Sequence, residues 1–404
     1  MGLLKHSNLA SYALGNVLKY RTRSVAIITA LVISTTLLCS AEFIREGVVL
    51  DITASMESGP DIIVQKLIGG RQTNVPIDWV ESVSATTGVN LVTSRVWGYT
   101  DIGNGILMTI IGINATEYGS IAGVTGTDIL GNGRFLEESD TRKIVIGQGI
   151  IDVMAASVSR VTIDVGTSIS LISFNGSLIE FEVIGIFSSQ SKAYSYDTIL
   201  TDQNSARDLF GVDDLSCTDL AIWTTSGSNV NDVAFRLDTS LADARILTNE
   251  GITDELLKTY SGRSGIVSLL WAVLLLTSVM VAFTVSSAGS DEARREVGLL
   301  KALGFDTVDI IEIRMFESLT LGILSASLGI SCAIVFDYIL GAPILSGYLL
   351  GWTLLLLNWE IPLAISAPVL FTVYVIAIVP ILVASVVPAW KNAITEPDVV
   401  LRGV

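Results

Sequence analysis

The chain has 404 residues, half of them hydrophobic, and its formal net charge is −16 with a single histidine. It contains no G-x-x-x-x-G-K-[ST] loop, no zinc-type spacing of Cys and His, and no credible nucleophile–base pair. We therefore expect no catalytic residue, no metal and no cofactor in this chain, and no nucleic-acid partner.

Four apolar stretches divide the chain into membrane segments and water-soluble segments. A membrane-spanning helix needs about 20 mostly apolar residues. The predicted order is an amphipathic helix at 1–23, a first span at 24–41, an α+β domain at 42–263, a second span at 264–288, a loop with a coupling helix at 289–314, a third span at 315–340, a loop at 341–361, a fourth span at 362–387 and a tail at 388–404. The predicted fold class is an α-helical membrane protein with four transmembrane helices and a large α+β extracytoplasmic domain inserted between the first and second.

The first segment is predicted to be a helix that lies in the membrane interface. Its apolar residues recur at helical spacing, and a basic cluster follows them. They are Leu9, Tyr12, Ala13, Val17 and Tyr20. A simple extension of the first span is the alternative.

The segment 42–263 alternates strand and helix patterns. Period-2 runs of β-branched residues predict strands, and Asn175-Gly176 between two such runs predicts a hairpin. Helices are expected at 76–88, 148–157 and 203–211, through 229–249, and from Thr253 into the second span. The segment also holds most of the acidic surplus, which favours solubility, with a site for cationic ligands as the alternative. Glycosylation triplets begin at Asn114 and Asn175.

Basic residues beside the spans predict the orientation. They precede the first span (Lys5, Lys19, Arg21, Arg23) and follow the second (Arg294, Arg295, Lys301, Arg314). By the positive-inside rule, both termini and the loop 289–314 are cytoplasmic, and the domain 42–263 is outside. The expected location is the cell membrane, with several spans.

The loop between the second and third spans contains a charged helix with an apolar stripe. Val297, Leu300 and Leu303 form the stripe, and Gly304 is expected to end the helix. A solvated linker helix explains the charges but not the stripe. The stripe needs a surface to cover it, either lipid or a partner protein.

The third span combines small residues with two acidic residues. Gly322, Ala326 and Gly329 permit close helix packing, within the subunit or across a dimer. Glu317 and Asp337 lie close to the span ends, where interfacial water lowers the cost of a charge. The next segment, 341–361, is expected to lie on or dip into the membrane, and a short fifth span is the alternative.

The stretch RREVGLLKALGF, followed by a span with Glu317 near its start, resembles the signature of the MacB/FtsX-type permeases of ABC transporters. The matched residues run from Glu296 to Gly304. The ending VVPAWKNAITEPDVVLR is similar to the family's closing pattern, although Ala393 falls one position late. Asp306 and Asp309 stand where the family commonly has basic residues. The start NVLKYRTRS and parts of the outer domain also resemble the family, so the resemblance covers almost the whole chain.

This resemblance implies a non-catalytic permease subunit that works with a separate ABC ATPase. ATP and Mg²⁺ would bind the ATPase, whose closure would move the permease and its outer domain, which includes a MacB-like core. The residues that would contact the ATPase or shape the contact are Arg294, Arg295, Glu296, Gly298, Leu300, Lys301, Leu303 and Gly304. Two permeases would form a homodimer or heterodimer surrounded by membrane lipid. The cargo stays open.

Two other function classes remain from the sequence. One is a membrane-anchored receptor or scaffold whose outer domain binds a partner without ATP. The other is an ectoenzyme, which the missing catalytic residues disfavour. A neighbouring gene that encodes a phosphate-binding loop would favour the transporter over the receptor.

Overall fold

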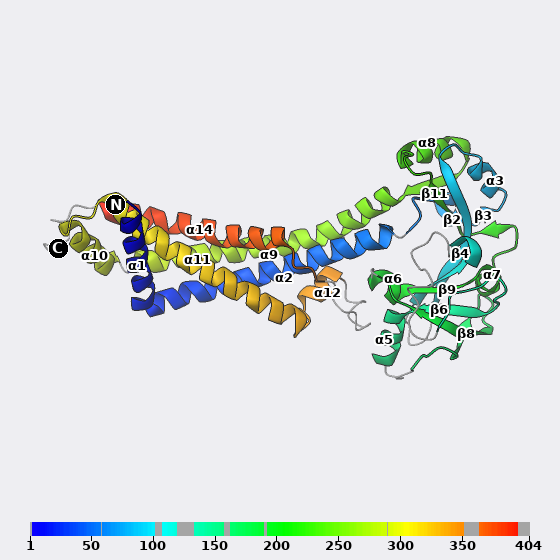
Figure 1. Ribbon diagram of the computed structural model, residues 1–404, viewed down its shortest axis with the longest axis horizontal. Coiled ribbons are helices and arrows are strands. Elements are labelled where there is room, and N and C mark those ends of the chain that lie inside the picture. Colours follow the sequence, from blue (N-terminus) through cyan, green and yellow to red (C-terminus); the bar gives the residue numbers. More distant parts are fainter. Residues whose placement is uncertain are drawn as a thin grey trace. The chain divides into compact units, whose positions relative to one another are not determined.

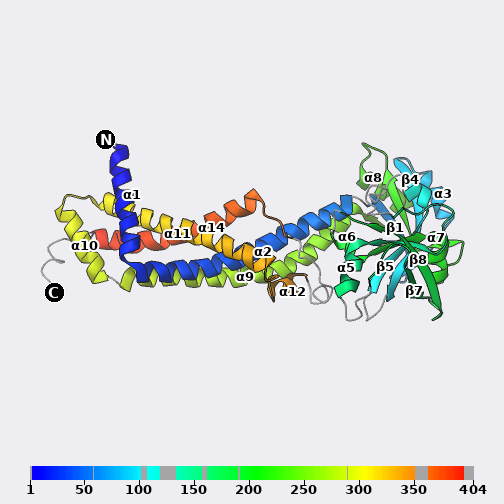
Figure 2. The same ribbon diagram turned by 60° about the horizontal axis from the view of Figure 1, so that its bottom comes forward.

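The computed structural model describes residues 2–57, 59–101, 107–118, 133–156, 162–189, 192–288, 290–350 and 363–394. The chain forms two compact units, drawn in Figures 1 and 2. The helical unit is built from Met1–Gly47, Ser261–Leu350 and Leu363–Val404, and the α+β unit is built mainly from Val48–Tyr260.

The α+β unit centres on one mixed sheet with the strand order β12-β1-β11-β4-β5-β9-β6-β8-β7, with β2 paired to β1. Its strands are β1 (Ile62–Ile68), β2 (Arg71–Thr73), β4 (Val89–Asp101), β5 (Leu107–Ile113), β6 (Lys143–Gly147), β7 (Ser168–Ile172), β8 (Leu178–Phe187), β9 (Thr198–Asp202), β11 (Asp219–Thr224) and β12 (Ala244–Thr248). Two short strands, β3 (Val75–Pro76) and β10 (Ser216–Cys217), pair separately. Most pairs are antiparallel, whereas β5–β9 and β6–β8 are parallel.

Short helices pack against this sheet and close its cores. They are α3 (Trp79–Ser84), α4 (Ala115–Tyr118), α5 (Gln148–Ala156), α6 (Lys192–Asp197), α7 (Gln203–Phe210) and α8 (Val230–Ser240). One core lies between α5 and the strands β5, β6 and β8, and a second lies between α3, α8 and the strands β1, β4 and β11. The mixed α+β architecture predicted for this part of the chain is confirmed.

One local expectation in this unit is wrong. The helical pattern through 229–249 ends with α8, and residues 244–248 form the edge strand β12. Asp243 takes a left-handed backbone with φ of 62°, after which β12 pairs antiparallel with β1, with Ile246 opposite Val64. Pairing with the edge of the sheet outweighs the local helical preference of this segment.

The helical unit contains long apolar helices and, among the described residues, three shorter ones. Its elements are α1 (Gly2–Lys19), α2 (Arg21–Glu57), α9 (Asn249–Ala288), α10 (Ser290–Ala302), α11 (Thr307–Tyr338), α12 (Leu345–Leu350) and α14 (Ala367–Ile394). Both views show α11 and α14 side by side (Figures 1 and 2). The chain passes between the two units within α2 and within α9.

Three described helices are long and apolar enough to cross a membrane: Arg21–Met56, Thr307–Tyr338 and Ala367–Trp390. The segment predicted as the second span lies in α9. Its apolar stretch among the described residues, Gly265–Met280, is shorter than the three candidate spans. Of the predicted loop 341–361, the structure describes residues up to 350, and the rest lies outside the described residues. The tail is described to residue 394, where α14 ends.

The small residues of α11 pack inside the subunit. A Cβ added to Gly329 would lie 2.7 Å from Thr35 Cβ on α2, and one added to Gly322 would lie 3.1 Å from Ile378 on α14. Ala326 between them is fully buried. Within the described residues, close packing of α11 on α2 and α14 accounts for the pattern, without a second copy of the chain.

Candidate functional site

The site is built around helix α10, which carries the charged motif singled out above. Gly304 ends this helix region in a left-handed conformation with φ of 94°. The Gly304 amide donates to the Lys301 carbonyl (3.0 Å), and the Phe305 amide donates to the Leu300 carbonyl (3.1 Å). This pair of bonds is the Schellman ending, which glycine favours because it needs a positive φ. The turn leads directly into α11.

The apolar stripe of α10 is covered mainly by the chain itself. Leu300 is buried in a cluster with Leu9 and Ala13 of α1 and with Ile313 of α11. Val297 is buried in contact with Ile310 of α11. The expectation that lipid or a partner covers the whole stripe is therefore wrong for Val297 and Leu300. Leu303, with 69% of its surface exposed, is the one stripe residue left uncovered.

Glu296 holds α10 to its neighbours through hydrogen bonds and an ion pair. Its Oε1 accepts from the Tyr12 hydroxyl (2.9 Å) and from Asn16 Nδ2 (3.2 Å), both on α1. Its Oε2 accepts from an Arg314 guanidinium nitrogen on α11 (3.3 Å). Glu296 therefore points inward and joins three helices, so the structure does not favour it as a surface contact for an ATPase. Burial, followed by the bond to Glu296, raises the pKa of Tyr12 to about 12.

Arg314 extends this network into α11. A second guanidinium nitrogen donates to Glu317 Oε2 at 2.7 Å, so one arginine is shared by two carboxylates. All three side chains are about nine-tenths buried. A buried charge persists at low cost only when it is paired and hydrogen-bonded. The shared arginine therefore makes the three side chains one electrostatic unit, which we call the latch: Glu296, Arg314 and Glu317.

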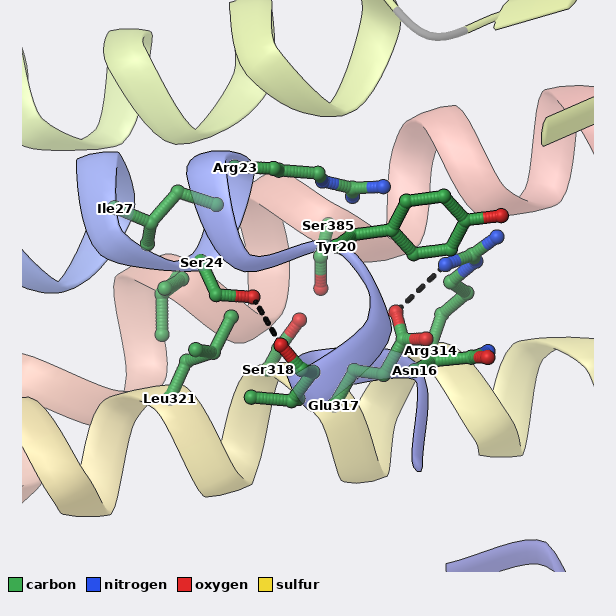
Figure 3. Close-up of a pocket in the computed structure, with 12 residues that line it drawn as sticks. Asn16, Tyr20, Arg23, Ser24, Ile27, Arg314, Glu317, Ser318, Leu321 and Ser385 are labelled. Carbon is green, nitrogen blue, oxygen red and sulfur yellow. Dashed lines mark hydrogen bonds and ion pairs between the residues drawn. The ribbon is translucent and has the colours of Figure 1, made fainter. Parts of the chain in front are cut away.

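A cavity of about 20 Å³ adjoins Arg314 and Glu317 of the latch. Figure 3 draws the side chains that line it. Residues of α1, α2, α11 and α14 line it, among them Asn16, Ser24, Glu317, Ser318 and Ser385. Among the described residues, Glu317 Oε1 has no hydrogen-bond partner. A cavity of this size and polarity can hold one water molecule, which would donate to that oxygen.

An ion pair and a hydrogen bond also connect α1 to α11. Lys5 Nζ lies 2.7 Å from Asp309 Oδ1, and His6 Nδ1 contacts Glu312 Oε1. The bond to Asp309 raises the pKa of Lys5. The predicted amphipathic helix thus buries Leu9 against α10 and α11.

The opposite face of α10 remains exposed. Leu299 is 62% exposed, Leu303 69%, and Val308 at the start of α11 70%. Gly298 is buried, Lys301 is partly exposed, and the side chains of Arg294 and Arg295 lie outside the described residues. Of the residues predicted from the family motif, Leu303 lies on this face and Glu296 and Leu300 do not. Helical spacing predicts the stripe but not Leu299 and Val308, because Leu299 lies on another face of α10 and Val308 lies on α11.

The two described acids of the third span are more deeply placed than expected. Glu317 is 7% exposed and Asp337 is 2% exposed, so interfacial water does not explain either carboxylate. Glu317 is paired with Arg314. Asp337 Oδ1 accepts a hydrogen bond from Ser40 Oγ of α2. Helix contacts within the subunit therefore satisfy one oxygen of each carboxylate, while Glu317 Oε1 and Asp337 Oδ2 have no hydrogen-bond partner among the described residues.

Both glycosylation triplets lie in the α+β unit at accessible turns. Asn114 Oδ1 accepts from the Thr116 amide (3.1 Å), and Asn175 Oδ1 accepts from the Ser177 amide (2.9 Å). Asn175 is exposed and Asn114 is partly exposed. The geometry leaves both side chains reachable, and their glycosylation stays a prediction.

Comparisons with known proteins support the resemblance seen in the motifs. Residues 24–240 match the MacB-like periplasmic core domain, and residues 268–397 match the FtsX-like permease C-terminal domain. An uncharacterized ABC transporter permease of Methanocaldococcus jannaschii is 23% identical over 423 residues and aligns with 99% of each chain.

Two solved structures are similar at low sequence identity. The periplasmic region of MacB from Actinobacillus actinomycetemcomitans is 14% identical, with a TM-score of 0.35, and the match covers 51% of this chain and 97% of that one. The extracellular domain of the noncanonic ABC-type transporter YknZ from Gram-positive bacteria is also 14% identical, with a TM-score of 0.33, and the match covers 46% of this chain and 99% of that one. The match to the MacB-like periplasmic core domain alone covers more than half of this chain. This chain therefore belongs to the MacB/FtsX family of ABC transporter permeases.

Proposed function

We propose that this chain is the permease subunit of an ABC transporter and that a separate ATPase subunit docks on the exposed face of α10. The observation that carries the proposal is the two-sided character of this helix. One face is fixed to α1 and α11 by the latch and by Leu300, while Leu299, Leu303 and Val308 are left exposed. Exposed apolar residues that lie together mark a surface for a partner.

The same contacts supply a path for mechanical force. A push on α10 reaches α11 through the pairing of Glu296 with Arg314, and α11 packs on α14 and α2. The ATPase would bind ATP and Mg²⁺, and this chain would contribute no catalytic group. We further propose four spans, the second in α9, with both termini on the cytoplasmic side and a pair of permeases in each transporter.

The test is co-purification, from detergent extracts, with the ABC ATPase subunits of the source organism. The test variant is Leu299→Asp with Leu303→Asp, which changes exposed side chains only. Leu18→Asp, also at an exposed leucine (68%) but on α1, is the matched control. Size-exclusion profiles of each variant alone report whether it is folded.

We expect the wild type and the Leu18 variant to retain the ATPase and the double variant to lose it. A double variant that still binds the ATPase would place docking elsewhere on the chain. A folded wild type that binds no ATPase would remove the transporter proposal and favour the receptor or scaffold.

A further inference from the structure

The α+β unit has a groove at the loop that connects β7 and β8. Its volume is about 700 Å³, and the walls come from this hairpin and from the chain that follows α7. Six side chains give it its character: Phe174, Leu178, Glu180, Asp208, Asp213 and Asp214.

Two exposed apolar side chains, Phe174 and Leu178, line the groove. Leu178 is 69% exposed and lies opposite Ile172 in the hairpin register, and Ile172 is itself 55% exposed. Phe174 in the connecting loop is 69% exposed. Neighbouring large apolar side chains that stay this accessible are unusual on the surface of a water-soluble domain. They suggest an anchor point for an apolar side chain of another molecule.

The hairpin loop is held firmly against the end of α7. The Phe174 amide donates to the Leu209 carbonyl at 2.9 Å. Gly211 takes a left-handed backbone with φ of 68°, and a Cβ at this position would lie 2.8 Å from the Phe174 ring. Glycine therefore allows the ring and the α7 turn to meet closely. The groove is preorganised, so little ordering cost would accompany binding.

The rim of the groove is acidic. Glu180, Asp208, Asp213 and Asp214 are all exposed there, against one exposed cation, Arg142. The other arginine of the lining, Arg207, is buried and donates to the carbonyls of Asp213 and Ser216. Among the described residues, no three acidic, His or Cys side chains converge closely enough to hold a metal ion. The acids line a groove that also contains the exposed apolar side chains Phe174 and Leu178, which suits an extended cationic ligand better than a metal ion.

We propose that this groove binds a basic segment of a partner protein. An apolar side chain of that segment would lie on Phe174 and Leu178, and flanking lysines or arginines would face the acidic rim. Opposite charges across an interface give specificity and speed association, while a central aromatic contact supplies most of the affinity. The inference does not depend on ATPase docking, which involves the other unit.

The experiment uses the full-length protein in non-ionic detergent micelles and a labelled pentapeptide with one phenylalanine between two pairs of lysines. Fluorescence anisotropy measures binding at low ionic strength and again at about 0.5 M salt, where exposed charges are screened. One groove variant is Phe174→Ser, and another is Asp213→Asn with Asp214→Asn. Asp232→Asn with Asp238→Asn on α8 is the control with the same change in charge, at exposed positions outside the groove.

We expect saturable binding that weakens with salt, and a loss of about tenfold in affinity for each groove variant. The α8 variant should bind as the wild type does, and a pentapeptide with glutamates in place of lysines should not bind. The proposal is overturned if the basic peptide does not bind saturably, if it binds the empty micelles equally well, or if the α8 variant loses as much affinity as the groove variants.

Discussion

Replacing Arg314 by glutamine should be among the most damaging single changes in the helical unit. Its guanidinium lies 2.7 Å from Glu317 Oε2 and 3.3 Å from Glu296 Oε2, and the arginine side chain is only 12% exposed. Arg314→Gln would leave two carboxylates without their shared cation in a site almost closed to solvent. Removing one partner of a buried ion pair costs about 3–5 kcal/mol. We expect a loss of unfolding free energy of about that size.

The assay is reversible unfolding of the purified protein in mixed micelles, followed by helical circular dichroism. Arg21→Gln is the matched control, because Arg21 is exposed and, among the described residues, its side chain donates to the Leu18 backbone carbonyl and to no carboxylate. A surface change of that kind should alter the unfolding free energy by about 0.5 kcal/mol or less. Adding Glu296→Gln to Arg314→Gln should recover part of the loss, because it removes one of the two unpaired charges.

The latch would be refuted as a stabilising unit if Arg314→Gln and Arg21→Gln unfolded alike. It would also be refuted if the double variant lost as much unfolding free energy as Arg314→Gln and Glu296→Gln lose together as single variants. Contacting residues that act as one unit show a coupling energy in such a cycle, whereas independent residues do not.

Three further predictions concern other parts of the chain. Gly329→Ala should be less stable than Gly15→Ala by about 1–3 kcal/mol in the same unfolding assay. The reason is that a methyl group at Gly329 would press on Thr35, whereas one at Gly15 would enter open space. Equal stabilities would contradict the close packing of α11 on α2. Asp219→Ala should cost the α+β unit about 3–5 kcal/mol, since Asp219 is 1% exposed and accepts two bonds from Arg95; unchanged resistance to proteolysis would contradict this. Tyr12, whose pKa is raised to about 12, should ionise at a higher pH than free tyrosine, so the stability it contributes is complete below pH about 10 and is lost as pH rises through 12. A difference titration against Tyr12→Phe that shows a midpoint near 10 would exclude the hydrogen bond from Tyr12 to Glu296.

The sequence predicted the helices and strands of both units more reliably than it predicted which of them pack or pair with one another. Hydrophobic length and spacing identify α2, α11 and α14, and turn residues identify the β7–β8 hairpin. The strand β12 was missed because its pairing partner β1 lies far away in the sequence. Local pattern carries no information about such a partner.

The candidate site was predicted in part, for the same reason. The spacing of Val297 and Leu300 shows that α10 has an apolar face, but nothing in that spacing says that α1 covers it. Arg314 and Glu317 are three residues apart on a helix, which is a recognisable signal for an ion pair. The further contact of Arg314 with Glu296 depends on the turn at Gly304, which folds α10 back toward α11.

The motif from Glu296 to Gly304 therefore combines two roles on one short helix. Glu296, Val297 and Leu300 face the subunit, whereas Leu299 and Leu303 face away from it. Changes to the inward residues should lower stability before any partner is present. Changes to the outward residues should leave the isolated permease folded and weaken only its proposed contact with the ATPase. A helix that transmits force needs both properties, because a docking surface moves the rest of the protein only if the helix that carries it is firmly attached.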